Sequence, residues 1–423
     1  MPARTARVGF AVIAATVAYG LIATAAGSNV GTHLPPLLYE WSPRVIATTP
    51  LLVIGLAAAA LLAPRLCSPS LSPWRFALAT LALGLALRIG LGMGRSGPSA
   101  LWSVFEVPKP ESSNEYLPAL PAFDLGLRFF LDTFAQIGPA LPVNAVGHPP
   151  GLLVTLHLLG IESAQAMAAL TIGVGALAVP LSYALARRLV AEPVARVATL
   201  LYAFAPSAVL HGATSADALF ATLATLALLA LVGAPRVART GGAAALALAS
   251  FFSWANLGIG ALATLVVWRR DGIAAALKLG AACAIGLLGF YGLLYWASGF
   301  DPVGAIRAAE SVYREGVAAH RPYGYWLFGS PAAFLIAAGL PITWYALRAL
   351  GAGRDIAVAL FAVLAISALL GFTKSETERI YLFLVPPLCI AAATALPSKR
   401  LCAVIGALAV QALAIELLFY TVW

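Results

Sequence analysis

The feature that most constrains how this chain can fold is a series of apolar stretches, each about as long as a helix that crosses a membrane. A spanning helix needs about 20 consecutive apolar residues, and about thirteen stretches of the chain meet that criterion. They lack the alternation of apolar and polar residues that marks the strands of a membrane barrel. We therefore predict an all-α polytopic membrane protein. The predicted spans lie near 8–26, 45–64, 75–93, 163–186, 194–210, 217–233, 241–253, 256–268, 273–296, 325–348, 356–372, 380–396 and 402–421.

The composition supports this class. The 423 residues are 61% hydrophobic and only 10% charged, with a formal net charge of +9, whereas a soluble protein carries about 25% charged residues. A positive charge would also suit a nucleic-acid-binding protein, but most of the excess lies in short loops between the apolar stretches. That distribution follows the positive-inside rule, so we expect no nucleic-acid partner.

The same distribution predicts the side of the membrane that each loop faces. With the N-terminus inside, the inner loops hold roughly sixteen basic residues against three acidic ones, and the outer face is mildly acidic. Arg4 and Arg7 precede the first apolar stretch as in a signal peptide, but no cleavage site followed by a soluble domain comes after it. We expect this stretch to be a retained span. The predicted outer segments are 27–44, 94–162, 211–216, 297–324 and 373–379. The paired stretches at 241–253 and 256–268 are short, and they are either two thin helices or one bent span.

Neither cysteines nor nucleotide-binding motifs indicate a bound cofactor. The four cysteines lie in predicted spans or on the inner side, with no metal-ligand spacing, and imply no disulfide. Five histidines without paired spacing predict no metal site. The chain also lacks a P-loop, a Rossmann glycine pattern, an HExxH motif and a nucleophile elbow. The cysteines are Cys67, Cys283, Cys389 and Cys402.

The longest outer segment, residues 94–162, is polar and rich in aromatic residues and proline. Long loops are usually functional or disordered, and this one has no low-complexity character. Between Pro118 and Gly138, apolar residues share one helical face, opposite a charged stripe that recurs every four residues. We predict one helix lying flat in the membrane interface. The apolar residues are Phe123, Leu127, Phe130, Leu131 and Phe134, and the charged residues are Asp124, Arg128 and Asp132.

A second short helix is predicted after His148. Two prolines follow this histidine, and proline is favoured in the first turn of a helix. Residues 151–160 are too few to cross a membrane, so we interpret them as a half-helix that begins at the membrane surface. His148 is then either a structural histidine or a ligand-binding group at a helix N-terminus, where anions bind.

Two acids are the leading candidates for chemistry. Glu115 lies in the long outer segment, where a partly desolvated carboxylate can act as a general base on a hydroxyl; the alternative is a solvated loop acid. Asp217 begins a predicted span, where it either caps the helix or serves as a second acid that positions an acceptor or a metal. Asp124 and Asp132 lie on the charged stripe and are expected to face lipid head groups.

Basic residues in the later outer segments predict a phosphate site. Arg321 can clamp a phosphate through its planar guanidinium, with His320 and Tyr323 beside it. The alternative is an interfacial belt, where tyrosine and tryptophan gather in any case.

Charged residues elsewhere extend this candidate site. Lys374, Glu378 and Arg379 belong to a cluster of four charges in a short turn between two predicted spans. Arg88 lies inside the third apolar stretch, about one and a half turns from its outer end. An ionisable residue there is a functional candidate, although its side chain can also snorkel to the surface.

Taken in order, these residues resemble the C-type (GT-C) glycosyltransferases, in the branch of the protein O-mannosyltransferases and the aminoarabinose transferase of lipid A. The resemblance covers roughly residues 75–270. It consists of an acid followed by tyrosine in the first long outer loop, an interfacial helix, a His-Pro-Pro half-helix, a span ending in Ala-Arg-Arg-Leu, and a span closing at Pro-Ser with Asp217 soon after. Arg321-Pro-Tyr and Glu378-Arg379 look like outer-loop elements of bacterial members.

The resemblance implies a membrane enzyme that moves a sugar, with inversion, from a polyprenyl-phosphate-linked donor to an acceptor hydroxyl of a glycan, lipid or protein. The reaction would occur on the extracytoplasmic side of a bacterial-type plasma membrane. In that branch an Asp-Glu pair in the first outer loop supplies the base, through its Asp. This chain has Asn114-Glu115 instead, so either Glu115 takes the base role, the register differs, or the protein is inactive. The resemblance requires no cofactor and is compatible with a divalent metal. The substrate-binding residues it implies are Asn114, Tyr116, His148, Arg88, His320, Arg321, Tyr323, Lys374, Glu378 and Arg379.

The resemblance also predicts how the chain is divided. Residues 1–74 would form two additional N-terminal spans, because the matching region begins after them. Residues 75–296 would form the catalytic core with outer loop 94–162. Residues 297–423 would form the C-terminal spans.

Three other functions fit the same residues. A ligase or polymerase of lipid-linked oligosaccharides would differ in its donor rather than in topology. A transporter or flippase for an anionic or lipid-linked substrate would use Arg88 and Asp217 within the membrane and need no base at Glu115, but the inverted repeats common in transporters are not found. A purely structural membrane protein is the least compatible with so large a polar loop.

Overall fold

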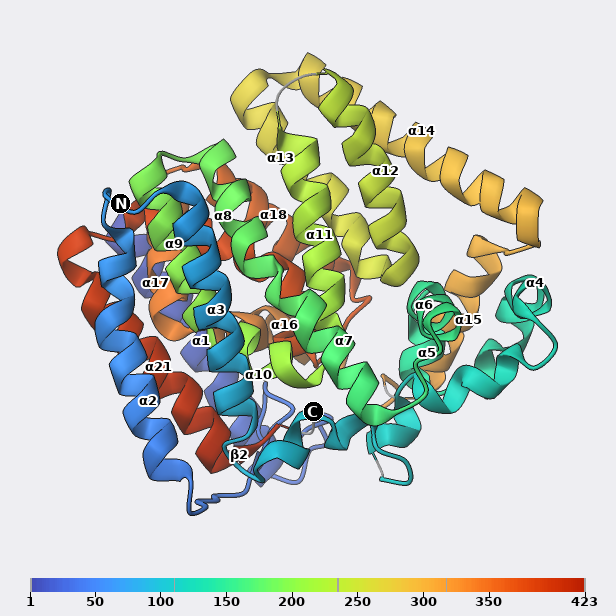
Figure 1. Cartoon of the computed structure of the whole chain (residues 1–423), viewed down its shortest axis with the longest axis horizontal. Helices are drawn as coiled ribbons and strands as arrows, with labels where there is room; N and C mark the ends of the chain where they lie inside the picture. The colour runs from blue at the N-terminus through green and yellow to red at the C-terminus, as the bar shows by residue number, and fades with distance from the viewer. Residues whose placement is uncertain (1, 110, 234–235, 317, 422–423) are drawn as a thin grey trace. The chain divides into compact units, whose positions relative to one another are not determined.

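The computed structural model describes residues 2–109, 111–233, 236–316 and 318–421, and most of these residues are helical (Figure 1). The predicted all-α class is confirmed. Within these ranges, seven helices are long and apolar enough to cross a membrane, or up to nine if each of two bent helix pairs is one span. These helices indicate a membrane-embedded protein, while the thirteen crossings stay a prediction.

Helix occupies every predicted span, and proline marks many of the helix starts, where its missing N–H costs nothing. The α-helices are α1 (Pro2–Ala25), α2 (Thr49–Leu62), α3 (Pro73–Gly92), α4 (Leu127–Ile137), α5 (Val143–Gly147), α6 (Gly151–Leu159), α7 (Ala164–Ala176), α8 (Ala178–Leu189), α9 (Glu192–Phe204), α10 (Pro206–Thr214), α11 (Asp217–Val232), α12 (Arg236–Phe252), α13 (Leu257–Asp271), α14 (Ile273–Ser298), α15 (Pro302–Glu315), α16 (Tyr323–Ala338), α17 (Leu340–Gly351), α18 (Asp355–Leu370), α19 (Thr377–Ile380), α20 (Val385–Ala395) and α21 (Leu401–Leu418). The 3-10 helices are η1 (Ala63–Cys67), η2 (Pro98–Leu101), η3 (Ser103–Phe105), η4 (Glu111–Asn114), η5 (Leu117–Phe123), η6 (Gly138–Ala140), η7 (Trp254–Asn256), η8 (Tyr381–Leu384) and η9 (Ser398–Arg400).

The chain divides into two compact units. Unit 1 contains Met1–Ala100, Thr171–Thr225 and His320–Trp423, and unit 2 contains Leu101–Leu170 and Leu226–Ala319. The division at residues 75 and 297 stays a prediction.

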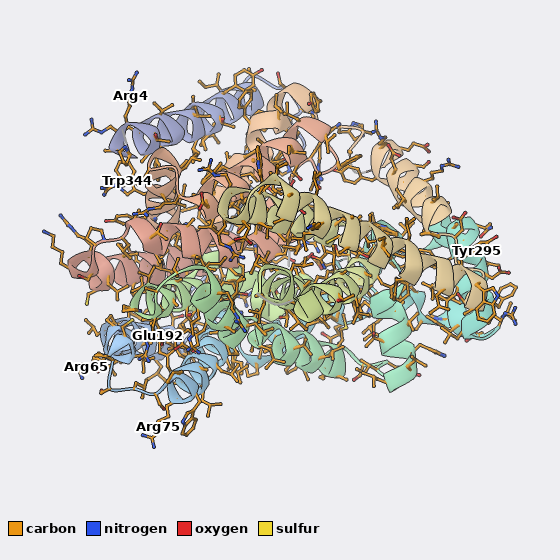
Figure 2. The ribbon with its side chains drawn as sticks, turned by 90° about the horizontal axis from the view of Figure 1, so that it is seen from above. Arg4, Arg65, Arg75, Glu192, Tyr295 and Trp344 are labelled. Atoms are coloured by element: carbon orange, nitrogen blue, oxygen red, sulfur yellow. The ribbon has the colours of Figure 1, made fainter. Side chains whose placement is uncertain are left out.

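Unit 1 is a bundle in which α1 packs against α16 and α17, α9 packs against α8 and α20, and α10 packs against α3. Helices α1, α2, α3, α9, α17 and α21 lie side by side in Figure 1. Figure 2 shows the side chains of Arg4, Arg65 and Arg75 pointing outward from this unit. All three belong to loops that the charge distribution assigns to the inner side.

Two predicted spans in unit 1 are bent rather than straight. The stretch at 325–348 was expected to be one helix, but α16 and α17 meet at 116°. The break lies at Gly339, which has a φ of 121° and stands two residues before a proline. The stretch at 194–210 bends by 53° between α9 and α10, because Pro206 holds the preceding residue out of the helical region.

In unit 2 the short stretches at 241–253 and 256–268 are two separate helices, α12 and α13, joined by η7. Both pack against α14, and α15 packs against α4 and α5. Whether α12 and α13 are two thin spans or one bent span stays a prediction.

The outer segment contains the expected amphipathic helix, but in two pieces. The 3-10 helix η5 and the α-helix α4 are separated at Gly126, which has a φ of 96°. A continuous helix cannot pass through a left-handed residue, so the prediction of one helix from Pro118 to Gly138 was wrong at this point. Phe130 and Phe134 are buried, whereas Asp124 and Asp132 are exposed, which agrees with the predicted faces.

The half-helix predicted at 151–160 is α6. Gly160 ends it in the left-handed conformation, with a φ of 62°, as glycine commonly does after the last turn of a helix. At its start, a Cβ atom on Gly151 would lie 2.3 Å from the carbonyl oxygen of Phe251. The helix is therefore closely packed against α12.

The α1–α2 connection, residues 26–48, crosses one end of unit 1. It contains β1 (Glu40–Trp41), which pairs antiparallel with β2 (Phe419–Tyr420). The guanidinium of Arg95 donates to the carbonyl oxygens of Glu416 and Phe419 and to Ser42 Oγ. These contacts fix the connection to the C-terminal end of α21.

Candidate functional site

Unit 1 contains a chain of buried ion pairs that joins three of the predicted site residues. Arg379 Nη1 lies 2.8 Å from Asp217 Oδ2, and Arg379 Nη2 lies 3.0 Å from Glu376 Oε2. The other oxygen of Glu376 lies 2.9 Å from Arg321 Nη2. We call Asp217, Arg379, Glu376 and Arg321 the ion-pair chain. Each charge faces an opposite charge, which is the condition under which buried charges are tolerated.

The backbone around Glu376 is held in an unusual conformation. Ser375 and Glu376 have φ values of 68° and 61°, a region that costs a residue with a side chain about 1–2 kcal/mol. Ser330 stabilises this turn, because its hydroxyl accepts from Ser375 N and its carbonyl accepts from Thr377 Oγ1. The turn places the Glu376 carboxylate between the two arginines.

Asp217 is fixed at the start of α11. Ser215 Oγ accepts from Asp217 N and donates to Asp217 Oδ2 at 2.7 Å. Ser215 thus bonds the first N–H of α11, and Asp217 Oδ2 also accepts from Arg379. Arg321 Nη1 also donates to the carbonyl oxygen of Lys374 at 2.7 Å, so Lys374 joins the site through its backbone.

Three further buried polar residues adjoin the ion-pair chain. Glu378 follows in α19, and its Oε1 accepts from Leu38 N at 2.7 Å. The hydroxyl of Tyr39 lies 3.2 Å from His211 Nε2. Burial, and then the charge of Glu378, raise the pKa of Tyr39 well above its ordinary value, so the phenol stays protonated.

Arg88 is buried in α3 and does not snorkel. Its side chain is 2% exposed, and its Nε donates to the carbonyl oxygen of Ala208 in α10 at 3.1 Å. Two glycines make room for the guanidinium: a Cβ atom on Gly212 would lie 2.6 Å from Nε, and one on Gly84 would lie 3.4 Å from Nη1.

Unit 2 holds Glu115, which is 3% exposed. Its Oε1 accepts from Asn144 Nδ2 at 2.8 Å, so the alternative of a solvated loop acid is excluded. Tyr116 is buried beside it, with its ring centroid 6.2 Å from that of His148. Asn114 is exposed.

Besides Asn114, two of the predicted site residues lie at the surface. His320 and Tyr323 are exposed, and the hydroxyl of Tyr323 donates to the carbonyl oxygen of Leu369. They flank Arg321, whose side chain is buried.

An apolar groove in unit 1 is lined in part by Pro322, the residue after Arg321. It has a volume of about 580 Å³ and lies between α1 and α16. Its lining ends at Pro322, next to Arg321, and at Asn29 and Val30. A Cβ atom on Gly31 would lie 2.6 Å from Arg321 Cγ, so the α1–α2 connection packs directly on that arginine. The groove is lined by Val12, Ala15, Thr16, Tyr19, Ala23, Ser28, Asn29, Val30, Pro322, Gly324, Tyr325 and Phe328.

Four of these residues were not predicted from the sequence as site residues. Glu376 belongs to the cluster of four charges in the short turn between two predicted spans, and that cluster was the signal that could have identified it. His211 stood alone in an apolar stretch, and neither Tyr39 nor Asn144 had a local signal. Within the described ranges, no three His, Cys, Asp or Glu side chains are grouped so that they could hold a metal ion.

Comparisons with known proteins do not assign a family to this site. No protein-family model matches the chain. No curated protein and no solved structure matches it either. Its function must therefore be argued from the residues and their geometry.

Proposed function

We propose that this protein is a membrane glycosyltransferase that moves a sugar from a polyprenyl-phosphate-linked donor to an acceptor hydroxyl on the extracytoplasmic side, with inversion. The groove between α1 and α16 is the observation that carries the proposal, because its lining includes Pro322, which directly follows Arg321. A lipid-linked donor needs an apolar groove for its tail and cationic groups where the tail meets its phosphate.

The arginines suit a leaving phosphate. Negative charge develops on that phosphate as the sugar departs, and groups already oriented toward it stabilise it without reorganising. Glu376 holds both Arg321 and Arg379 in fixed directions. We infer that Arg321 contacts the phosphate, while Arg379 is oriented by Asp217.

Glu115 is the proposed base. Its carboxylate is buried, and its Oε1 is oriented by the amide of Asn144. Asp217 is bonded to a guanidinium, which favours its ionised form and makes it the weaker candidate for taking a proton.

Transfer from farnesyl-phosphate-linked sugars, assayed with purified protein in liposomes, tests the base. Glu115→Gln keeps the size of the side chain but cannot take the proton, so the rate should fall by about 10²–10⁴-fold. Asp124→Asn, at an exposed acid in the same outer segment, is the matched control and should keep the rate. A normal rate in Glu115→Gln with an inactive Asp217→Asn would reassign the base. Normal rates in both would contradict the mechanism.

The groove is tested by filling it. Ala14 and Ala15 are neighbouring exposed alanines on α1, and only Ala15 lines the groove. Ala15→Trp should raise the KM for the donor, whereas Ala14→Trp should not. An equal response of the two variants would show that the donor does not use this groove.

Sidedness is tested by labelling with an impermeant thiol reagent, in a background without the four native cysteines. Ser113 and Ser398 are both exposed, so Ser113→Cys should label from outside and Ser398→Cys from inside. Labelling of both from one side would contradict the topology.

A transporter is the second candidate, favoured by the bent pair of α16 and α17. Broken helices beside a buried charge are typical of transporter binding sites. Proteoliposomes that move the lipid across the membrane, with Glu115→Gln fully active and no sugar transfer, would favour it. A requirement for a pyrophosphate-linked donor would instead indicate an oligosaccharide ligase or polymerase.

A further inference from the structure

Glu378 has one carboxylate oxygen without a hydrogen-bond partner. The side chain is 1% exposed, and Oε1 accepts from the backbone N–H of Leu38. Oε2 is buried, and the described residues give it no partner. Nearly all buried polar atoms in proteins are bonded, because leaving one unbonded costs about 1–3 kcal/mol. This oxygen therefore points to a polar ligand.

His211 has an orphaned atom as well. It is fully buried in α10, and its Nε2 is bonded to the hydroxyl of Tyr39. Its Nδ1 is buried and, among the residues that the structure describes, meets no partner.

The two orphaned atoms belong to one cluster. Leu38 contacts Glu378 and the next residue, Tyr39, contacts His211. Arg379 also interacts electrostatically with both His211 and Glu378. Two shared neighbours thus hold Glu378 and His211 at the same end of the α1–α2 connection.

The chemistry of the two atoms selects the ligand. In the tautomer in which the Tyr39 hydroxyl donates to His211 Nε2, the proton of the neutral imidazole lies on Nδ1. The cluster then offers one N–H donor and one carboxylate acceptor. A hydroxyl group can accept from the first and donate to the second, whereas an anion would be repelled by Glu378.

We propose that Glu378 and His211 bind the hydroxyl groups of the donor's sugar, and that Tyr39 is a positioning residue for His211. This inference rests on the proposed function. The α1–α2 connection contacts the groove at Asn29, Arg321 at Gly31 and this cluster at Leu38 and Tyr39. Tail, phosphate and sugar would follow one another along that segment.

The test compares the binding of farnesyl-phosphoryl-mannose with that of farnesyl phosphate, which has no sugar, to purified protein. Glu378→Gln replaces the acceptor oxygen, so the affinity for the sugar-bearing lipid should fall by about 10- to 100-fold, the range of one hydrogen bond to a charged group. The affinity for farnesyl phosphate should not change. His211→Gln should act in the same direction.

Two tyrosine variants separate positioning from packing. Tyr39→Phe keeps the ring but removes the hydroxyl bonded to His211 Nε2, so the tautomer of His211 is no longer fixed. It should therefore weaken the binding of the sugar-bearing lipid and leave the binding of farnesyl phosphate unchanged. Tyr381→Phe removes another buried hydroxyl of unit 1, which is bonded to Ser367. This change should weaken the binding of neither lipid. If Glu378→Gln does not fold, as judged by gel filtration, Tyr39→Phe and His211→Gln decide the matter.

The outcomes distinguish the two proposals. In one outcome the wild-type protein binds the sugar-bearing lipid more tightly than farnesyl phosphate, and Glu378→Gln, His211→Gln and Tyr39→Phe keep the same ratio of affinities. That result would overturn the sugar subsite and leave the proposed function standing. An equal loss of affinity for both lipids in the variants also overturns the sugar subsite, because the residues would then bind the phosphate or stabilise the fold. Wild-type protein that does not prefer the sugar-bearing lipid overturns the proposed function and the subsite together.

Discussion

The two units hold their buried acids in different ways. In unit 1, Asp217 is bonded to Arg379, which lies 162 residues away in the sequence. In unit 2, Glu115 accepts from the side-chain amide of Asn144, only 29 residues away. A guanidinium favours the ionised carboxylate strongly, whereas a neutral amide does so much less.

This difference bears on the roles proposed for the two acids. The ion-pair chain ties together α11, the turn before α19 and the segment just before α16, so Asp217 helps to fix those elements. Glu115, the proposed base, is oriented by the amide of a residue in the same outer segment.

The largest effect on stability is expected from breaking the ion-pair chain. Arg379→Ala leaves the buried Asp217 and the 14% exposed Glu376 without this guanidinium, and removal of one partner of a buried pair costs about 3–5 kcal/mol. Arg314→Ala is the control, because Arg314 and Glu310 form a pair with 66% and 45% exposed side chains. Such pairs contribute about 0–1 kcal/mol. Unfolding in detergent measures both, and equal losses would mean that the ion-pair chain is not structural.

A smaller effect is expected at the amide of unit 2. Asn144→Ala removes one bond from the Glu115 carboxylate, which should cost about 1–3 kcal/mol of stability. Asn114→Ala changes an exposed asparagine next to Glu115 and should stay within about 0.5 kcal/mol. A loss in Asn144→Ala as large as that of Arg379→Ala would remove the contrast between the two units.

The contrast also explains what the sequence could predict. The length of the apolar stretches predicted the helices, and the spacing of Phe130 and Phe134 predicted the buried face of α4, because both signals are local. The pairing of Arg379 with Asp217 has no local signal, since either could have faced water or another partner. The contact of Tyr39 with His211 joins segments 172 residues apart and was equally invisible. The bend at Gly339 had a signal, a glycine shortly before a proline, but thirteen straight spans were the simpler interpretation.

The smallest effect is expected at Gly126, where the predicted interfacial helix is broken. A Cβ atom there would meet nothing within 4 Å, so Gly126→Ala changes only the backbone preference. Its φ of 96° is unfavourable for alanine, and a left-handed residue costs about 1–2 kcal/mol.

Gly147→Ala is the matched control, because its Cβ atom would also meet nothing within 4 Å and it ends α5 without a positive φ. That change should be neutral or stabilise by about 0.4–1 kcal/mol. If both variants unfold at the same temperature, the left-handed turn is not required by the fold. The outer segment could then form the continuous helix that its pattern of apolar residues predicts, and α4 would not be fixed by Gly126. A lower unfolding temperature for Gly126→Ala alone would show that the fold requires the left-handed turn before α4. A single glycine would then be a local determinant of structure in unit 2, in contrast to the long-range pairs of the ion-pair chain in unit 1.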